Sequence, residues 1–236
     1  MRLSKFITLC GISSRRKSED LIRSGIVKVN NVIIFEPQFK VLPEIDIVTV
    51  YDNRVNQISS KIYVALNKPV KYLSDLSYND DRSIARSLIN IDAYLFPVGR
   101  LDYYSEGLMV FTNDGDFAYK IMHPKYEVEK EYQVKFKGIL SSEDIKKIKK
   151  GLLINGYIYK INKIILFKES FKNSWYKVTV NEGKNRMIRI IGDQINHKVI
   201  KLKRVRMGNI KLGNLKPGEY RFLRKGDISS CKMPPD

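Results

Sequence analysis

Residues 97–116 read PVGRLDYYSEGLMVFTNDGD, an acidic, glycine-punctuated stretch in the middle of a basic chain. It carries four carboxylates against one basic side chain, Arg100, whereas the whole chain has 43 Lys+Arg and 25 Asp+Glu. GLMVFTN predicts a half-buried strand, and TNDG is a turn signal. A carboxylate at the start of the next helix, DFAYKIM, can cap free amides and favour the helix dipole. We therefore interpret Asp114 and Asp116 as structural, which leaves Asp102 to be explained.

The composition narrows the class of protein. The chain has 236 residues, enough for one large domain or for a medium and a small one, with a formal net charge of +18. A pI near 9.7 favours a polyanionic partner, nucleic acid before membrane. Apolar runs are too short for a membrane span or a signal peptide. Cys10 and Cys231, with His123 and His197, are too few for a disulfide framework or a zinc site, so we expect a cytoplasmic protein without a metal.

Two parts differ in pattern, residues 1–51 and 62–236, and the polar, aperiodic stretch 52–61 predicts a linker. The second part mixes strand and helix signals without strict alternation, which favours the α+β class. The elements expected in the first part are a helix over 2–9, a second helix capped by Ser13 or Ser14 and ended by Gly25, strands over 26–30 and 32–35 joined by a turn at Asn30-Asn31, and a strand pair over 41–51 interrupted by Pro43. Those expected in the second part are strands over 62–67, 107–113, 129–136, 160–167 and 175–181, and helices over 83–89, 116–122, 142–151 and 186–195.

The amino-terminal part concentrates positive charge. Residues 1–30 contain seven basic and two acidic side chains, and Arg15, Arg16 and Lys17 fall in the first turn of the second helix. Cations are disfavoured at that end of a helix dipole, so a shared phosphate would explain them. A solvated charge run is the alternative interpretation.

The stretch RLSKFITLCGISSRRKSEDLIRSGIVKVNN resembles the S4-type RNA-binding domain. In that family two short helices present basic residues to structured RNA. The resemblance, over about fifty residues, implies binding but no chemistry. The residues that it would place on the RNA face are Arg15, Arg16, Lys17, Lys28 and Asn30.

Asp102 follows Arg100 in a loop rather than at a helix start. An Asx turn or a local ion pair is the ordinary explanation for such an aspartate. A carboxylate within a phosphate-binding surface would repel RNA, however. We therefore expect Asp102 to be paired with a cation, to be catalytic, or both.

G-R-L-D-x-x-S-x-G-L, followed by TNDG and HPK, is similar to the signature of rRNA pseudouridine synthases of the RsuA/RluB type. That family moves the ribose bond of a uridine from N1 to C5, without a metal or organic cofactor. The resemblance implies that Asp102 is the catalytic aspartate. Whether it attacks the sugar as a nucleophile or abstracts a ribose proton as a base stays open.

The resemblance also implies partners for Asp102. Tyr132 would stack on the loosened base, although strand alternation equally predicts a core tyrosine that shares a face with Val134 and Phe136. Arg189 would pair with Asp102, with an ordinary helical pair to Asp193 as the alternative. The further substrate-binding residues are Arg100, which would help to extrude the nucleotide, Ile188, which would support the base, and Arg186, Lys184 and Asn185.

Residues 181–225 carry an excess of ten basic side chains. In KVIKLKRVRMG, alternation predicts a strand whose Lys201, Lys203 and Arg206 reach outward to phosphates, with a solvated strand face as the alternative. Two positions depart from the family pattern: Met187 replaces a usual Gln, and Lys71 replaces a usual Gly.

The sequence thus predicts an RNA-modifying monomer: an S4-type domain over 1–51, a linker over 52–61, and a synthase domain over 62–236 with a mixed, mainly antiparallel sheet flanked by helices. The expected partner is ribosomal RNA or a ribosomal subunit precursor, the large subunit being favoured and the small one possible. A non-catalytic RNA-binding or ribosome-assembly protein with a decayed synthase domain is the alternative. A methyltransferase is less favoured because no glycine-rich cofactor loop follows a strand.

Overall fold

The computed structural model describes residues 1–58, 60–75, 81–170 and 172–229. Cys10 is buried, and Cys231 lies outside the described residues. The chain divides into two compact units. The amino-terminal unit comprises Met1–Ile62, Ile91–Phe96 and Thr112–Asp114, and the carboxy-terminal unit comprises Tyr63–Asn90, Pro97–Phe111 and Gly115–Asp236.

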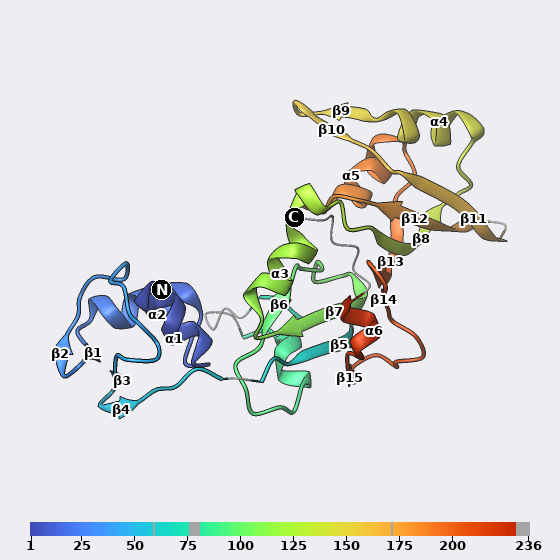
Figure 1. Ribbon diagram of the computed structural model, residues 1–236. Helices are drawn as coiled ribbons and strands as arrows, with labels where there is room; N and C mark the ends of the chain where they lie inside the picture. Colours follow the sequence, from blue (N-terminus) through green and yellow to red (C-terminus); the bar gives the residue numbers. More distant parts are fainter. Residues whose placement is uncertain (59, 76–80, 171, 230–236) are drawn as a thin grey trace. The chain divides into compact units, whose positions relative to one another are not determined.

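The amino-terminal unit packs two helices against a small antiparallel sheet of order β2-β1-β3-β4 (Figure 1). Ser14 caps the second helix, as expected, by accepting from the Lys17 amide. Asn30 and Asn31 both have positive φ, which gives the predicted tight hairpin turn. The elements are α1 (Leu3–Leu9), α2 (Arg15–Arg23), β1 (Val27–Val29), β2 (Val32–Ile33), β3 (Val48–Val50) and β4 (Asn53–Arg54).

The strand pair expected over residues 41–51 is wrong. Only Val48–Val50 forms a strand there, because the preceding loop satisfies its hydrogen bonds locally: the Asp46 carboxylate accepts from the Leu42 amide, and the Asp46 amide donates back to the Leu42 carbonyl. β3 pairs with β1 and with β4, and β4 lies inside the stretch expected to be a linker.

The carboxy-terminal unit is built on a large mixed sheet that has nine strands among the described residues. Seven of them follow the order β11-β12-β8-β13-β7-β5-β15, while β14 pairs with β13 and β6 pairs with β7. Its pairs β11–β12, β12–β8, β8–β13 and β5–β15 are antiparallel, whereas β13 and β7 run parallel. The predicted α+β class is confirmed. The elements are β5 (Tyr63–Lys68), η1 (Ala85–Leu88), β6 (Phe96–Val98), β7 (Glu106–Thr112), α3 (Gly115–Met122), η2 (Pro124–Tyr126), β8 (Lys130–Lys137), α4 (Ser142–Lys150), β9 (Leu152–Ile154), β10 (Tyr157–Tyr159), β11 (Lys163–Ser170), β12 (Asn173–Val180), α5 (Met187–Gln194), β13 (Val199–Met207), β14 (Ile210–Lys211), β15 (Tyr220–Phe222) and α6 (Lys225–Ser229).

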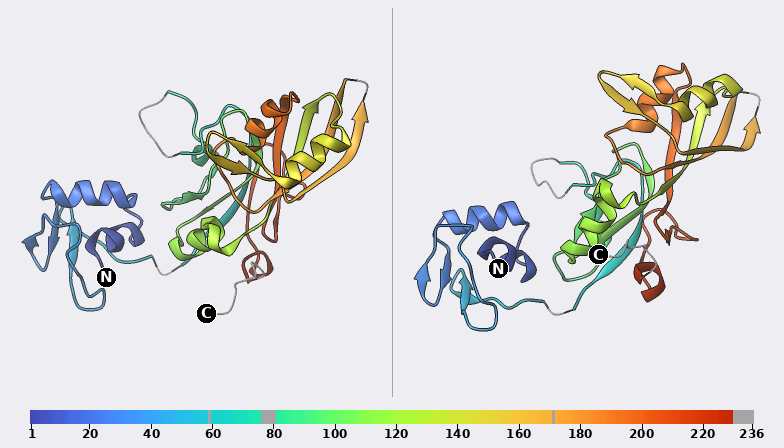
Figure 2. Two further views of the ribbon diagram at one scale, coloured as in Figure 1. Left: turned by 90° about the horizontal axis from the view of Figure 1, so that it is seen from above. Right: turned by 45° about the horizontal axis from the view of Figure 1, so that its top comes forward.

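Helices α4 and α5 cover one side of strands β8 and β12, with the β9–β10 hairpin beside them (Figures 1 and 2). Ile148 from α4 and Ile191 from α5 are fully buried in the same apolar cluster as Val134, Phe136 and Val178 of the strands. Burial alternates along β8 as predicted, because successive side chains of a strand point to opposite faces. This sheet face positions α5 and β8, which both contribute to the site below.

Two further elements differ from expectation. The helix expected over 83–89 is reduced to the short 3₁₀ turn η1, because Leu73 pairs as a bridge with Ile84 and extends the backbone there. The β9–β10 hairpin was not predicted. Its turn, Asn155-Gly156, has positive φ at both positions, and this dipeptide between apolar residues is the signal that would have indicated it.

Candidate functional site

A cavity of about 1310 Å³ opens in the carboxy-terminal unit. Segments far apart in the sequence line it, among them the segment after β5, the loop after β6, the end of α3, strand β8, the loop before α5, and strand β13. The predicted site residues in its lining are Arg100, Asp102, Tyr132, Lys184, Asn185, Arg186 and Ile188.

Asp102 and Arg189 meet at this cavity. The Arg189 Nε lies 3.6 Å from the Asp102 Oδ2, an ion-pair distance rather than a hydrogen bond, and the two side chains are 13% and 26% exposed. Burial lowers the pKa of Arg189, and the charge of Asp102 opposes that shift. Among the described residues no ion pair joins Arg189 to Asp193, the alternative partner.

Backbone carbonyls hold the guanidinium of Arg189 in place. Its Nη2 donates to the Tyr104 carbonyl at 3.0 Å, and its Nη1 donates to the Val199 carbonyl at 3.2 Å. Ser105 lies between the two charged groups: its Oγ is 3.4 Å from Nη2 and donates to the Asp102 Oδ2 at 3.5 Å. Arg189 is therefore oriented by the loop that carries Asp102.

Tyr132 lies on the buried face of β8, in phase with Val134 and Phe136. It is 9% exposed, belongs to the apolar cluster, and also lines the cavity. The two interpretations of this tyrosine, core residue and site wall, are therefore compatible.

The loop before α5 forms another wall. Helix α5 begins at Met187, one residue later than the expected start, since Arg186 precedes it with a left-handed φ of 53°. Ile188 is buried at the cavity. Lys184 donates to the Ile158 carbonyl at 2.7 Å and pairs with Glu182 at 3.1 Å, so its charge is partly engaged within the chain. The side chain of Met187 packs in the apolar cluster.

Arg100 is an exposed side chain at the rim, 3.8 Å from the carboxylate of Asp75. Lys71, the departure from the family's usual glycine, has a φ of 64° and donates its amide to the Tyr103 carbonyl at 2.7 Å. A left-handed conformation explains why glycine suits this position. Lys71 adopts the same turn with its side chain exposed.

Three buried cations beneath the site were not predicted: Lys68, Lys130 and Arg204. Lys68 is fully buried and donates to the carbonyls of Pro69 and Ser105 at 2.8 and 3.0 Å. Burial lowers the pKa of Lys68 and that of Lys130 to about 8. Arg204 is 3% exposed and donates from Nε to the Leu108 carbonyl at 2.8 Å.

A sequence signal for these cations exists. Lys68 ends an otherwise buried strand, and Lys130 and Arg204 are in phase with the buried Tyr132 and Leu202 on their strands. A cation at an apolar-phase position indicates a buried charge. Gly107 pairs with Arg204, and at its φ of 108° a Cβ would overlap the Arg204 backbone, which explains the glycine of SEGL.

The predicted RNA-facing residues on β13 lie differently from one another. Bulges interrupt the alternation of β13, so Lys201 is exposed and Lys203 is half-buried. Arg206 pairs with Glu129 at 2.8 Å and lies 3.6 Å from Glu131. Arg206 therefore has two carboxylate partners on the neighbouring segment, and its contact with RNA phosphates remains a prediction.

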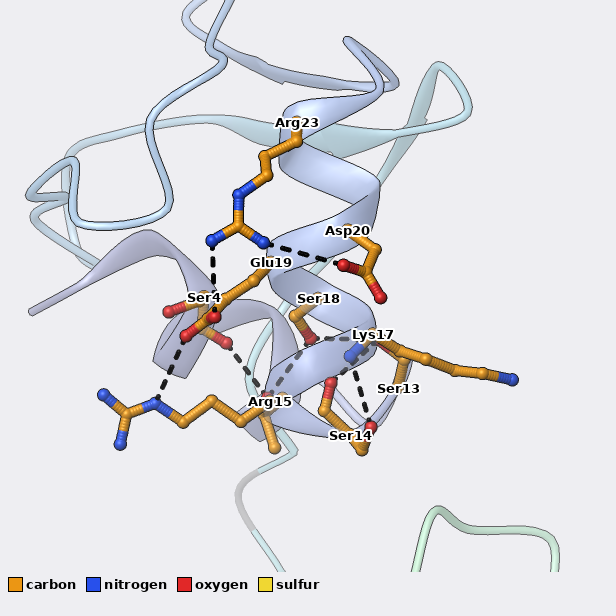
Figure 3. Close-up of polar contacts among 10 residues, drawn as sticks. Ser4, Ser13, Ser14, Arg15, Lys17, Ser18, Glu19, Asp20 and Arg23 are labelled. Carbon is orange, nitrogen blue, oxygen red and sulfur yellow. Dashed lines mark hydrogen bonds and ion pairs between the residues drawn. The ribbon is translucent and has the colours of Figure 1, made fainter. Parts of the chain in front are cut away.

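In the amino-terminal unit, the basic side chains of α2 are exposed, and Arg15 and Arg23 form long ion pairs with acidic residues of the same helix (Figure 3). Arg15 lies 3.9 Å from Glu19, and Arg23 bridges Glu19 and Asp20. Arg16 and Lys17 are exposed on the first turn of α2. A buried hydroxyl contact, Ser13 to Ser18 at 2.9 Å, lies behind them where α1 meets α2.

The two remaining residues of that face have internal partners. Lys28 donates to Asp52 at 2.6 Å. The Asn30 side chain donates to Asp46 and accepts from the Ile47 amide. Asn30 therefore holds a loop of its own unit, and its contact with RNA remains a prediction.

Within the described ranges no helix has the length and apolar character to cross a membrane. The same residues hold no group of three or more His, Cys, Asp or Glu that could bind a metal ion.

Comparison with known proteins gives consistent matches. The family model described as RNA pseudouridylate synthase matches residues 62–194, and the S4 domain model matches residues 1–47. An uncharacterized RNA pseudouridine synthase of Aquifex aeolicus is 38% identical over 231 residues, covering 97% of this chain and 92% of that protein.

The ribosomal large subunit pseudouridine synthase B of Bacillus subtilis is 36% identical over 230 residues, covering 96% of this chain and 93% of that protein. A crystal structure of a pseudouridylate synthase superposes with a TM-score of 0.69 at 26% identity, covering 98% of this chain and all of that one. With the aspartate loop and the amino-terminal basic module on one chain, this protein belongs to the RNA pseudouridine synthase family and carries an S4 domain.

Proposed function

We propose that this synthase isomerises a specific uridine of ribosomal RNA, with large-subunit RNA as the favoured substrate. The name of the Bacillus subtilis relative supports that choice of RNA. The observation that carries the site assignment is the 3.6 Å pair of Asp102 and Arg189 at a cavity lined by Tyr132. The protein would act as a cytoplasmic monomer on ribosomal RNA or a subunit precursor.

In this reaction the bond from ribose C1′ to N1 breaks, the uracil turns, and C1′ bonds to C5. The C5 hydrogen leaves as a proton and N1 gains one, so the atoms balance without a cofactor. Asp102 either attacks the sugar as a nucleophile or takes a ribose proton as a base. Arg189 orients the carboxylate, because its guanidinium is itself fixed by two carbonyls.

The base must leave the helical stack before it can turn. Tyr132 offers a ring beside the cavity on which the loose uracil stacks, and Ile188 supports it from α5. Arg100, exposed at the rim, takes the place of the extruded nucleotide. The domain over 1–51 supplies affinity through Arg15, Arg16 and Lys17, while the domain over 62–236 supplies chemistry.

Tritium release tests the proposal. We expect the full-length protein to release tritium from [5-³H]uridine-labelled large-subunit rRNA transcripts, and Asp102→Ala to lose at least about a thousandfold in rate because the reacting group is gone. Asp116→Ala, an exposed carboxylate in the first turn of α3, is the matched control.

Filter binding with the same transcripts separates the alternative. Equal RNA affinity of the wild type and Asp102→Ala, with turnover lost in the variant alone, supports the enzyme. A wild type that binds rRNA but releases no tritium from large- or small-subunit transcripts would favour the non-catalytic assembly protein. Mapping of pseudouridines in rRNA from cells with and without the gene then identifies the uridine.

A further inference from the structure

An aromatic cluster at the end of α3 and in η2 is not used by the proposed mechanism. Tyr119, Met122, His123 and Tyr126 form it, and we call it the Tyr119 platform. The Tyr119 ring is 4.7 Å from the His123 ring and 6.1 Å from the Tyr126 ring, centroid to centroid. Tyr119 is 48% exposed and Met122 is exposed beside it. Large aromatic and sulfur-bearing side chains gathered on a surface indicate a binding site.

The backbone holds these rings in place. His123 ends α3 by donating its amide to the Tyr119 carbonyl, and its Nδ1 accepts from the Lys125 amide at 3.2 Å. The Tyr126 amide donates back to the His123 carbonyl at 3.1 Å, which closes the turn of η2. The platform is therefore ordered before any ligand arrives, which lowers the entropic cost of binding.

Cations accompany the rings. The Lys125 Nζ lies 4.7 Å from the centroid of the Tyr126 ring and 5.7 Å from that of Tyr119. Lys120 lies in the last turn of α3. Aromatic rings with a lysine over their faces suit a nucleotide, since a base can stack on a ring in place of the lysine while phosphates attract the displaced cation.

The platform adjoins the catalytic loop. The Gly99 amide donates to the Met122 sulfur at 2.9 Å, three residues before Asp102. Met122 and Pro124 line the same cavity as Asp102 and Tyr132. The cavity, about 1310 Å³, exceeds the roughly 300–1,000 Å³ of a pocket for one small molecule, so it has room for more than the target nucleotide.

We propose that the Tyr119 platform binds, by stacking, an unpaired RNA base that flanks the target uridine. This inference rests on the proposed function, because flipping a nucleotide unstacks its neighbours and leaves their faces free. Stacking is tolerant of base identity, so the platform contributes affinity and register along the strand rather than reading sequence. Tyr132 holds the reacting base, and Tyr119 holds the next one.

Steady-state tritium release with an rRNA transcript provides the test. We expect Tyr119→Ala to raise KM about tenfold, from the loss of one base stack, while kcat stays within twofold. Tyr119→Phe should restore the wild-type KM because the ring is kept. Tyr157→Ala is the matched control, since Tyr157 is a 63% exposed tyrosine on the β9–β10 hairpin and does not belong to the Tyr119 platform.

A transcript with an abasic residue beside the target sharpens the test. Loss of the flanking base should raise the wild-type KM, while Tyr119→Ala, which has no stack left to lose, should be much less affected. A Tyr119→Ala KM within twofold of the wild type and of Tyr157→Ala would overturn the inference, as would equal penalties from the abasic residue in both proteins.

Failure of the proposed function can be distinguished from failure of this inference, because the wild type would then release no tritium. In that case filter binding still tests whether the Tyr119 platform binds RNA. The same transcripts are used with the wild type, Tyr119→Ala, Tyr119→Phe and Tyr157→Ala. Weaker binding by Tyr119→Ala than by Tyr157→Ala supports it, and equal binding refutes it. Thermal unfolding of each variant verifies that the fold is intact.

Discussion

The amino-terminal and carboxy-terminal units use their cations in opposite ways. In the S4 domain the predicted RNA-facing cations of α2, Arg15, Arg16 and Lys17, are exposed, and the partner of Arg15, Glu19, is a half-buried carboxylate 3.9 Å away. In the synthase unit Lys68, Lys130 and Arg204 are withdrawn from water. The same residue types in one basic chain therefore serve two purposes, and burial rather than charge count distinguishes them.

The physical reason is the strength of each interaction in its surroundings. An exposed ion pair contributes about 0–1 kcal/mol, so phosphate can displace the carboxylate at little cost. A buried cation that loses its partner retains an uncompensated charge in a medium that solvates it poorly. The exposed cations of the S4 domain can therefore exchange a carboxylate partner for an RNA phosphate, whereas the buried cations of the synthase unit keep their partners within the protein.

The largest effect should come from the site pair. We expect Arg189→Ala to reduce kcat about 100- to 1,000-fold, because Asp102 loses both its counter-charge and the group that orients it. Arg189→Lys should recover part of the rate, since a lysine keeps the charge but not the planar fork. Tritium release measures both. The exposed Lys150→Ala is the control, and a kcat within fivefold of the wild type for Arg189→Ala would contradict the pairing role.

A smaller effect is expected from the exposed cations of the S4 domain. The double variant Arg16→Ala/Lys17→Ala should raise KM for rRNA roughly three- to tenfold and leave kcat unchanged, because phosphate contacts add affinity without chemistry. The slope of log affinity against log salt should fall by about one to two. Lys149→Ala/Lys150→Ala on α4 removes the same charge elsewhere. An identical KM shift in both doubles would show that net charge alone matters.

The smallest effect concerns a buried lysine and pH. Burial lowers the pKa of Lys130 from 10.5 to about 8, so between these values the unfolded chain binds one more proton than the folded chain. The free energy of unfolding therefore rises with pH in this window, and the cost of burying the charge is complete below pH 8. Lys130→Met lacks this rise.

Denaturant unfolding at pH 7.5 and 9.5 measures this pH dependence of the unfolding free energy. The difference in unfolding free energy, wild type minus Lys130→Met, should grow with pH by on the order of 1 kcal/mol after solvent screening. Lys137→Met, at the exposed end of the same strand, should show no such growth. A pH-independent difference for Lys130→Met would mean that this lysine stays charged or remains solvated in the folded protein.

Local pattern predicted most of the elements. The cap at Ser14, the turn at Asn30-Asn31 and the alternation along β8 depend on neighbouring residues, and each is found. The predictions failed where a segment bridges a more distant part of the chain, or where a side chain rather than a neighbouring strand satisfies the backbone hydrogen bonds. Residues 83–89 looked like an α-helix, but a bridge between Leu73 and Ile84 extends Ile84 and leaves only the 3₁₀ turn η1 after it. Residues 41–47 looked extended, but Asp46 ties them into a loop.

The amino-acid sequence by itself determined the family and the modular order and made Asp102 the candidate for the catalytic aspartate, because short motifs and charge patterns are local properties of the chain. Only the tertiary structure decided which arginine faces Asp102, that Asn30 and Arg206 have internal partners, and that three cations lie buried beneath the cavity. Those facts depend on which distant segments the sheet brings together, and on how much water remains around each charge once they have packed.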